Sequence, residues 1–313
     1  MSGTNNKKIN NKRWLGQATP FARQQRIGQL DPVTDYPEIT RLFYADFMSI
    51  MLSQSFNGFM LTFAAPRMSA LLASTGEVEQ RFAKRFVDTA LFARSIMEQG
   101  FDSDCGRSAT RRVNTMHRQF DIHPDDFVIV GVDAALASLE LAEKFGWREV
   151  TEGERDSIVR YYNRESRAFG CPRSLPSTVA EMRSFWNHYL DTQLAYAPQN
   201  ERLARVALEW YLTLFPLPLR PLFRRVLLAN VDERILRACG MRKPSSPMQW
   251  ASNTMMKLLG RRDPLPDGTP DGLEDIVKRV YPDGWKIEEL GPCPRHNPAG
   301  AELDHADAGV QLR

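Results

Sequence analysis

The chain has 313 residues, of which 42% are hydrophobic, 41 are Lys or Arg and 38 are Asp or Glu. This length and hydrophobic content allow a large core, so we expect a folded globular protein. A net charge of only +3 creates no strong field for nucleic acid, and no nucleic-acid partner is expected. The four cysteines lie far apart with no histidine at zinc-ligand spacing, which argues against a disulfide framework and a zinc motif.

The start of the chain and its apolar stretches bear on location. Residues 1–30 are polar and basic, and we predict that they form a flexible segment without an apolar h-region, which favours a cytoplasmic protein. Polar residues interrupt the longest apolar stretch, residues 43–73, so no transmembrane span is expected. Residues 214–225 mix apolar and cationic side chains, as interfacial segments do. A loop followed by a helix is the preferred interpretation there, and peripheral membrane contact is the alternative.

Apolar residues recur at helical spacing along most of the chain, and alternating β-branched runs are almost absent. We therefore predict an all-α fold, a single multi-helix domain over residues 31–262. The expected helices cover residues 38–63, 68–72, 78–98, 108–120 with Ser108 as N-cap, 124–141, 151–169 with a Thr151–Glu154 capping box, a helix starting at Ser177, 199–214, 220–239 and 247–259. Residues 263–313 are rich in Pro, Gly and Asp, and we expect an extension that ends in a loosely attached tail.

One histidine is the leading candidate for chemistry. On the helix expected over residues 108–120, Asn114 and His117 share a face that we expect to turn inward. A neutral imidazole there can bind iron through one ring nitrogen while a hydrogen bond holds the other, and Asn114 can line the same pocket. The alternative is a structural core histidine that makes two hydrogen bonds.

Basic and hydroxyl side chains accompany this histidine. Arg85 and Thr89 are i and i+4 on one predicted helix, so both can point at one ligand, where they can orient oxygen. A solvated basic face is the alternative for Arg85. Arg111 and Arg112 flank the histidine face, where one of them can reach a haem propionate, or both can be exposed. A histidine opposite an arginine and a hydroxyl is typical of a haem pocket.

No other motif competes with this site. The sequence has no Gly-rich phosphate loop, no nucleophile elbow, no H-E-x-x-H zinc motif and no dinucleotide fingerprint.

Together these stretches resemble a family that joins the bacterial rubber oxygenases (latex-clearing proteins), the fungal endoplasmic-reticulum oxygenase of mycophenolic acid biosynthesis and uncharacterised bacterial proteins. The resemblance spans residues 38–244, and the order of its motifs is more specific than any one of them. The matching stretches are Arg85-x-x-x-Thr89, the Gly100 turn, Arg111-Arg112-x-Asn114-x-x-His117, Phe145-Gly146-Trp147-Arg148-x-x-Thr151-x-x-Glu154 and Phe169-Gly170-Cys171-Pro172-x-x-Leu175-Pro176-Ser177-Thr178.

The resemblance implies a globin-like helical core around haem b, with His117 as the proximal iron ligand and Arg85 and Thr89 as distal residues. It implies an oxygenase in which O₂ bound at the iron cleaves a carbon–carbon double bond of an apolar, isoprenoid or lipid-like substrate. Rubber oxygenases have a lysine before the distal threonine that can cap the iron, whereas this chain has Asp88. We expect Asp88 to pair with Arg85 or to be exposed.

Rubber oxygenases are also secreted, and the fungal relative has an N-terminal anchor. Because this chain shows neither feature, polymeric rubber is not the expected substrate. Two further functions stay open: a haem carrier or sensor without turnover, and a haem-free helical lipid-binding or interaction module in which His117 is structural.

Overall fold

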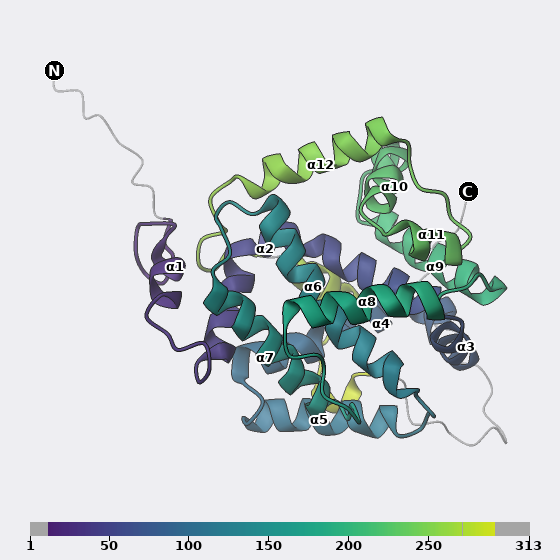
Figure 1. The fold of residues 1–313 in the computed structure, drawn as a ribbon, viewed down its shortest axis with the longest axis horizontal. Coiled ribbons are helices and arrows are strands. Elements are labelled where there is room, and N and C mark those ends of the chain that lie inside the picture. Colours follow the sequence, from purple (N-terminus) through teal and green to yellow (C-terminus); the bar gives the residue numbers. More distant parts are fainter. Residues whose placement is uncertain (1–11, 271, 292–313) are drawn as a thin grey trace.

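The computed structural model describes residues 12–270 and 272–291, and every regular element within them is a helix (Figure 1). The predicted all-α, single-domain fold is confirmed for this part of the chain. In chain order the helices are α1 (Ala22–Ile27), α2 (Tyr36–Ala64), α3 (Pro66–Thr75), α4 (Glu77–Gln99), α5 (Asp104–His117), α6 (Pro124–Phe145), α7 (Glu152–Ala168), α8 (Val179–Gln193), α9 (Pro198–Thr213), η1 (Leu217–Leu219), α10 (Arg220–Ala229), α11 (Glu233–Ala238), α12 (Ser246–Gly260), α13 (Leu273–Val280) and η2 (Ile287–Glu289).

Helix α2 forms the centre of the domain. Apolar residues recur on every side of this 29-residue helix, which is the pattern of a helix surrounded by other helices. It packs against α6, α7 and α9, and Phe43, Phe56 and Phe63 are almost fully buried between them. Helix α2 ends before Pro66, because the residue before a proline disfavours helical dihedral angles, and Pro66 then begins α3.

The strand-like run at residues 127–132 is part of a helix, as predicted. Pro124 stands in the first turn of α6, and the His123 side chain accepts a hydrogen bond from Asp125 N. Val128, Ile129 and Val132 are buried against the surrounding helices. The β-branched side chains therefore serve packing, which overrides their preference for strands.

Three predicted helix boundaries are wrong. The N-cap of α5 is Ser103 rather than Ser108, because its hydroxyl accepts a hydrogen bond from Gly106 N at 2.9 Å, and α5 ends at His117. The N-cap of α8 is Thr178 rather than Ser177. The helix expected over residues 220–239 is two helices, because Asp232 accepts a hydrogen bond from Arg234 N and starts α11 anew.

The two ends of the described chain pack against each other. Trp14 is buried, and its indole N–H donates to Pro264 O at 3.0 Å. Arg23 forms an ion pair with Asp267 at 2.9 Å. Residues 12–30, expected to be flexible, are thus anchored, because Trp14 and Arg23 find partners far away in sequence. The expectations for residues 1–11 and 292–313 lie outside the described residues.

Among the described helices, none has both the length and the apolar character that crossing a bilayer requires.

Arg148 connects α2 to the start of α7 through a buried ion network. Its guanidinium lies 2.8 Å from the Asp46 carboxylate and 2.7 Å from that of Glu154. Glu154 also closes the predicted capping box with Thr151 at the start of α7. Because a buried charge is stable only when it is paired, residues 148–154 contribute to the stability of the fold.

Removal of the Arg148 charge is expected to destabilise the protein. The Arg148→Met variant leaves Glu154 buried without its counter-ion and Asp46 with only Arg23 at 3.6 Å, so its free energy of unfolding should fall by about 3–5 kcal/mol in urea titrations. The exposed Arg160 on α7 is the matched control, and Arg160→Met should change stability by no more than about 0.5 kcal/mol. Equal losses in the two variants would contradict this role.

Candidate functional site

His117 is the last residue of α5, and its ring is held by the end of α7. Its Nδ1 atom lies 3.0 Å from the carbonyl oxygen of Phe169. Because a carbonyl can only accept a hydrogen bond, Nδ1 carries the hydrogen and Nε2 keeps its lone pair. Phe127 packs edge-on against the imidazole, with ring centroids 5.3 Å apart.

The imidazole of His117 is held in its neutral form. Burial lowers its pKa, the nearby charge of Arg85 lowers it further, and the hydrogen bond to Phe169 O opposes both effects. A neutral ring with a free Nε2 lone pair is the state that binds a metal ion.

Asn114 lies one turn before His117 and makes a parallel contact. Its side-chain amide donates to Ala168 O at 2.7 Å. The carbonyls of the last turn of a helix have no partner within that helix, so Asn114 and His117 satisfy two of them on α7. Gly170 follows with a φ of +88°, and a Cβ there would lie 2.7 Å from Asn114 Oδ1. Only glycine fits this close approach without displacing Asn114.

Arg85 on α4 acts on the imidazole through its charge. No hydrogen bond or ion pair joins its guanidinium to another described residue, and burial lowers its pKa despite the opposing charges of Asp88 and Glu77. Its charge in turn lowers the pKa of His117, so the two predicted residues lie within electrostatic range of each other. A partly covered guanidinium without hydrogen bonds is costly unless a ligand supplies an acceptor.

Thr89 and Arg111 occupy more exposed positions than this pair. The Thr89 hydroxyl donates to Arg85 O at 2.9 Å within α4, so its role as a distal hydroxyl stays a prediction. Arg111 donates to Ser108 Oγ at 2.9 Å. It also lines a cavity of about 280 Å³ between α5 and α7, with Phe101, Asp102, Arg107, Thr110, Arg164 and Ala168. Neither His117 nor Arg85 lines this cavity.

Asp88 is buried and pairs with residues other than Arg85, contrary to expectation. Its carboxylate accepts hydrogen bonds from Lys84 Nζ at 2.7 Å and from Gly291 N at 2.8 Å. The Tyr281 hydroxyl donates to the same carboxylate. Tyr281 and Gly291 belong to residues 281–291, which we call the C-terminal segment. From the sequence, these residues are predicted to be part of an extension.

The C-terminal segment connects α4 to α5. Lys84 donates to Gly291 O at 3.0 Å, and Arg112 on α5 donates to Leu290 O at 2.8 Å. Leu290 is fully buried. Arg112 therefore braces this segment, and its predicted contact with a propionate stays a prediction.

Helix α13, which leads into the C-terminal segment, was not predicted from the sequence. Leu273, Ile276, Val277 and Val280 recur at i, i+3, i+4 and i+7 and pack on the core. Acidic residues stand in its first turn and basic residues in its last, as the helix dipole favours. This short amphipathic pattern was the available signal.

A second buried polar cluster, between α2 and α7, was also missed. The hydroxyls of Tyr44 and Tyr162 share a hydrogen bond. Glu165, one turn after Tyr161 and Tyr162, has its pKa raised to about 7 by burial. Its charge also raises the pKa values of these tyrosines, although burial is the larger cause.

The comparisons with known proteins give a family. A family model described as "ER-bound oxygenase mpaB/B'/Rubber oxygenase, catalytic domain" matches residues 42–261. This range contains every predicted site residue, whereas the C-terminal segment lies outside it. No curated protein matches the chain.

The raised pKa of Glu165 predicts a pH-dependent stability. Since its pKa rises from 4.5 in the unfolded chain to about 7 in the folded state, its contribution is fully present below pH 4.5 and is lost as the pH rises through 7. Glu165→Gln, which cannot ionise, should therefore be about 1–3 kcal/mol more stable than the wild type at pH 8 and similar to it at pH 4 in urea titrations. The exposed Glu149 is the control, and Glu149→Gln should show no such difference. A stability gap that is the same at both pH values would contradict burial as the cause.

Proposed function

Because the chain belongs to the family of the mpaB and rubber oxygenase catalytic domains, we propose that it is a haem b-dependent oxygenase acting on an apolar, unsaturated substrate. An isoprenoid or another lipid-like molecule is the expected substrate class, with O₂ as co-substrate. The observation that carries the proposal is the neutral His117 ring, whose Nδ1 is engaged by the Phe169 carbonyl and whose Nε2 is left to bind iron.

The residues around His117 fit a haem group by their chemistry. Within the described ranges, no cluster of three or more His, Cys, Asp or Glu side chains could hold a metal ion. A haem iron needs only one imidazole from the protein, because the porphyrin supplies the other four nitrogens. Arg85, which has no hydrogen bond to a described residue, carries a charge that acts on this imidazole, and its donors could serve a ligand.

Each residue would have a distinct part. Haem b, when bound, would supply an iron that binds and activates O₂. His117 would hold the iron, while Asn114 keeps the end of α7 in place for the Phe169 hydrogen bond. Arg85 would donate hydrogen bonds to oxygen and stabilise negative charge there. Arg111, at the rim between α5 and α7, would bind a propionate carboxylate.

The surrounding helices would give the substrate an apolar environment. Buried phenylalanines of α2 and the Val128–Leu139 part of α6 would form its walls. The C-terminal segment covers α4 and α5, which would exclude water from the same region. Thr89 would join the site if its hydroxyl turned from Arg85 O toward the ligand.

Haem binding is expected to depend on His117. After reconstitution with haem, the wild type should show a Soret band, and His117→Ala should lose it. Asn114→Ala, which frees the end of α7, should weaken haem affinity by about tenfold or more. The exposed His188 on α8 is the control, and His188→Ala should bind haem as the wild type does.

A colourless wild type that is folded by circular dichroism would reject the haem proposal and favour a haem-free lipid-binding module. An unchanged spectrum in His117→Ala would reject this ligand.

Turnover is expected to depend on Arg85. In an oxygen electrode, haem-loaded protein should consume O₂ when given squalene, an unsaturated isoprenoid. Arg85→Ala should lower kcat by about 10²-fold and still retain haem, because it removes donors to oxygen and leaves the iron ligand intact. Arg81 on the same helix, paired with Glu77 at the surface, is the control, and Arg81→Ala should keep full activity.

Haem-loaded protein that consumes no O₂ with any unsaturated substrate would contradict the oxygenase and indicate a haem carrier or sensor.

A further inference from the structure

A separate surface lies over η1, α10 and α12, which contact one another along the chain or in space. Six large apolar side chains are exposed there, and they are more than half of the eleven exposed large hydrophobics among the described residues. They are Leu214, Leu217, Leu219, Leu222, Trp250 and Leu258. Leu217 and Trp250 keep 72% and 70% of their surface open, so they stabilise nothing in the fold by burial. We call this area the α10–α12 surface.

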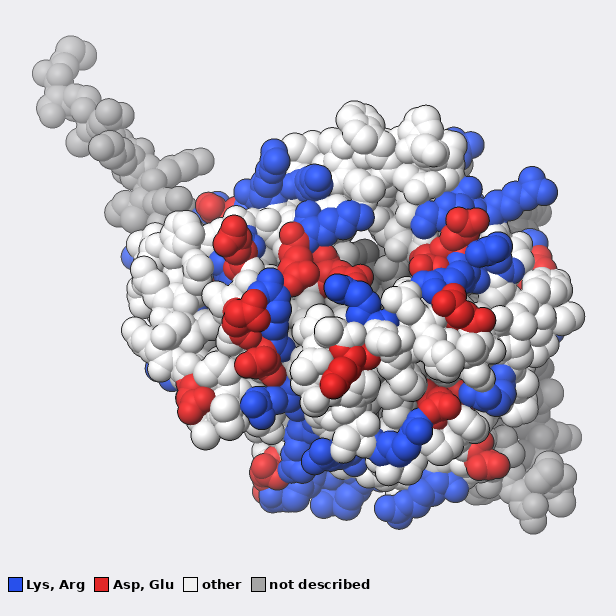
Figure 2. Space-filling model, in the orientation of Figure 1, with Lys and Arg blue, Asp and Glu red and all other residues white. Residues whose placement is uncertain are grey.

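The stretch of chain that carries the α10–α12 surface is basic as well as apolar. Residues 214–262 contain ten Lys or Arg and only two Asp or Glu, whereas the whole chain carries a net charge of +3. Figure 2 shows the edge formed by α12 as mostly uncharged, with lysines and arginines beside it. The positive charge is dense enough that Lys257 and Lys243, after burial, lower the pKa of Lys144 below α12.

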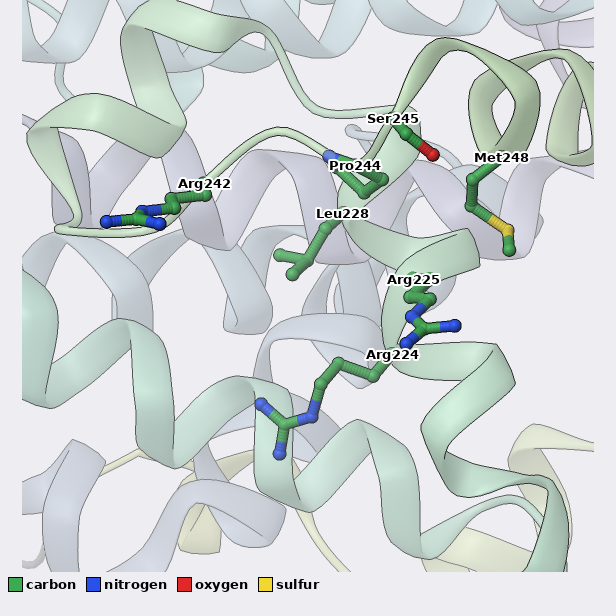
Figure 3. A pocket seen from close by; sticks show the side chains of 7 residues that line it. All are labelled: Arg224, Arg225, Leu228, Arg242, Pro244, Ser245 and Met248. Atoms are coloured by element: carbon green, nitrogen blue, oxygen red, sulfur yellow. The ribbon is translucent and has the colours of Figure 1, made fainter.

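Three arginines surround a cavity within this surface. The cavity, of about 420 Å³, is lined by Arg224, Arg225, Leu228, Arg242, Pro244, Ser245 and Met248 (Figure 3). Arg224 is paired with Glu209. No ion pair joins Arg225 or Arg242 to another described residue, and both are exposed. Two guanidinium groups are thus available beside an apolar floor.

The apolar side chains of η1 are held in place. Phe215 stacks on Phe223 with ring centroids 3.8 Å apart and an interplanar angle of 13°. Arg220 donates to Phe215 O at 3.3 Å. These contacts fix the turn that presents Leu217 and Leu219, so insertion of the two leucines into an apolar phase would cost little additional ordering.

We propose that the α10–α12 surface docks the protein onto an anionic lipid bilayer. Leu217, Leu222 and Trp250 enter the interface, and Arg225 and Arg242 bind lipid phosphates. A second copy of the chain is disfavoured, because two such surfaces would repel each other. Nucleic acid is disfavoured since a phosphate backbone gives no partner to the exposed leucines. This inference does not rest on the proposed function, because docking requires no haem.

Vesicle flotation of the full chain tests the proposal. The wild type should float with vesicles of phosphatidylcholine and phosphatidylglycerol in equal amounts and stay behind with phosphatidylcholine alone. The double variant Arg225→Glu with Arg242→Glu should bind the anionic vesicles more than about tenfold less tightly. The control variant Arg41→Glu with Arg160→Glu has the same net charge, but its substitutions lie at exposed positions outside this surface. Its affinity for the anionic vesicles should stay within about twofold of that of the wild type.

The apolar part has its own test. Leu217→Ser with Leu222→Ser should lose vesicle binding, whereas the exposed pair Val33→Ser with Val130→Ser should keep it. Anionic vesicles should shift the tryptophan emission of the wild type to the blue, and Trp250→Phe should reduce this shift.

Equal flotation with both kinds of vesicle, or equal losses in the charge-matched variants, would overturn the proposal. A dimer in light scattering that Leu217→Ser with Leu222→Ser dissociates, without vesicle binding, would assign the surface to a second copy. Circular dichroism establishes that every variant is folded.

Discussion

The candidate site depends on two carbonyl groups at the end of α7 that have no hydrogen-bond partner within their own helix. A helix cannot satisfy its own last carbonyls, and a buried acceptor without a partner costs about 1–3 kcal/mol. Asn114 and His117, one turn apart on α5, donate to Ala168 O and Phe169 O. The interaction that docks α5 on α7 therefore also selects the tautomer of His117. The ring is thus oriented by a main-chain carbonyl. A substitution of Phe169 would leave this carbonyl in the chain, whereas a substitution of a carboxylate side chain would remove the hydrogen-bond partner.

Arg148, Asp88 and Arg85 differ in how their charges are compensated. Arg148 and Asp88 are each fully engaged, by two carboxylates and by three donors respectively, and they hold helices together. Arg85 is partly covered, and no hydrogen bond or ion pair joins it to another described residue, although its charge acts on His117. A guanidinium in that state is suited to a ligand rather than to the fold. Asp88, the residue before Thr89, connects α4 to the C-terminal segment, and this segment lies outside the residues that the family model matches.

Local signals explain which helices were predictable. The Thr151–Glu154 capping box and the apolar periodicity of α4 and α9 act over a few residues, and the structure confirms these helices. The start of α5 was misplaced because Ser103 and Ser108 both resemble N-caps. The choice depends on a close approach that sequence does not reveal: a Cβ on Gly106 would lie 2.1 Å from Gly100 O. The helices α1 and α13 were missed because they are short: α1 has six residues and α13 eight, so even the clear periodicity of α13 covers little more than two turns.

By itself the sequence determined the all-helical class and a single histidine on an amphipathic helix, because both follow from the identity and spacing of nearby residues. Only the tertiary structure decided which groups His117 and Asp88 bond to. Phe169 O meets His117 across 52 positions, and Gly291 N meets Asp88 across 203. Such pairs depend on how whole helices pack, and on which backbone groups their ends leave unsatisfied, so no local pattern specifies them.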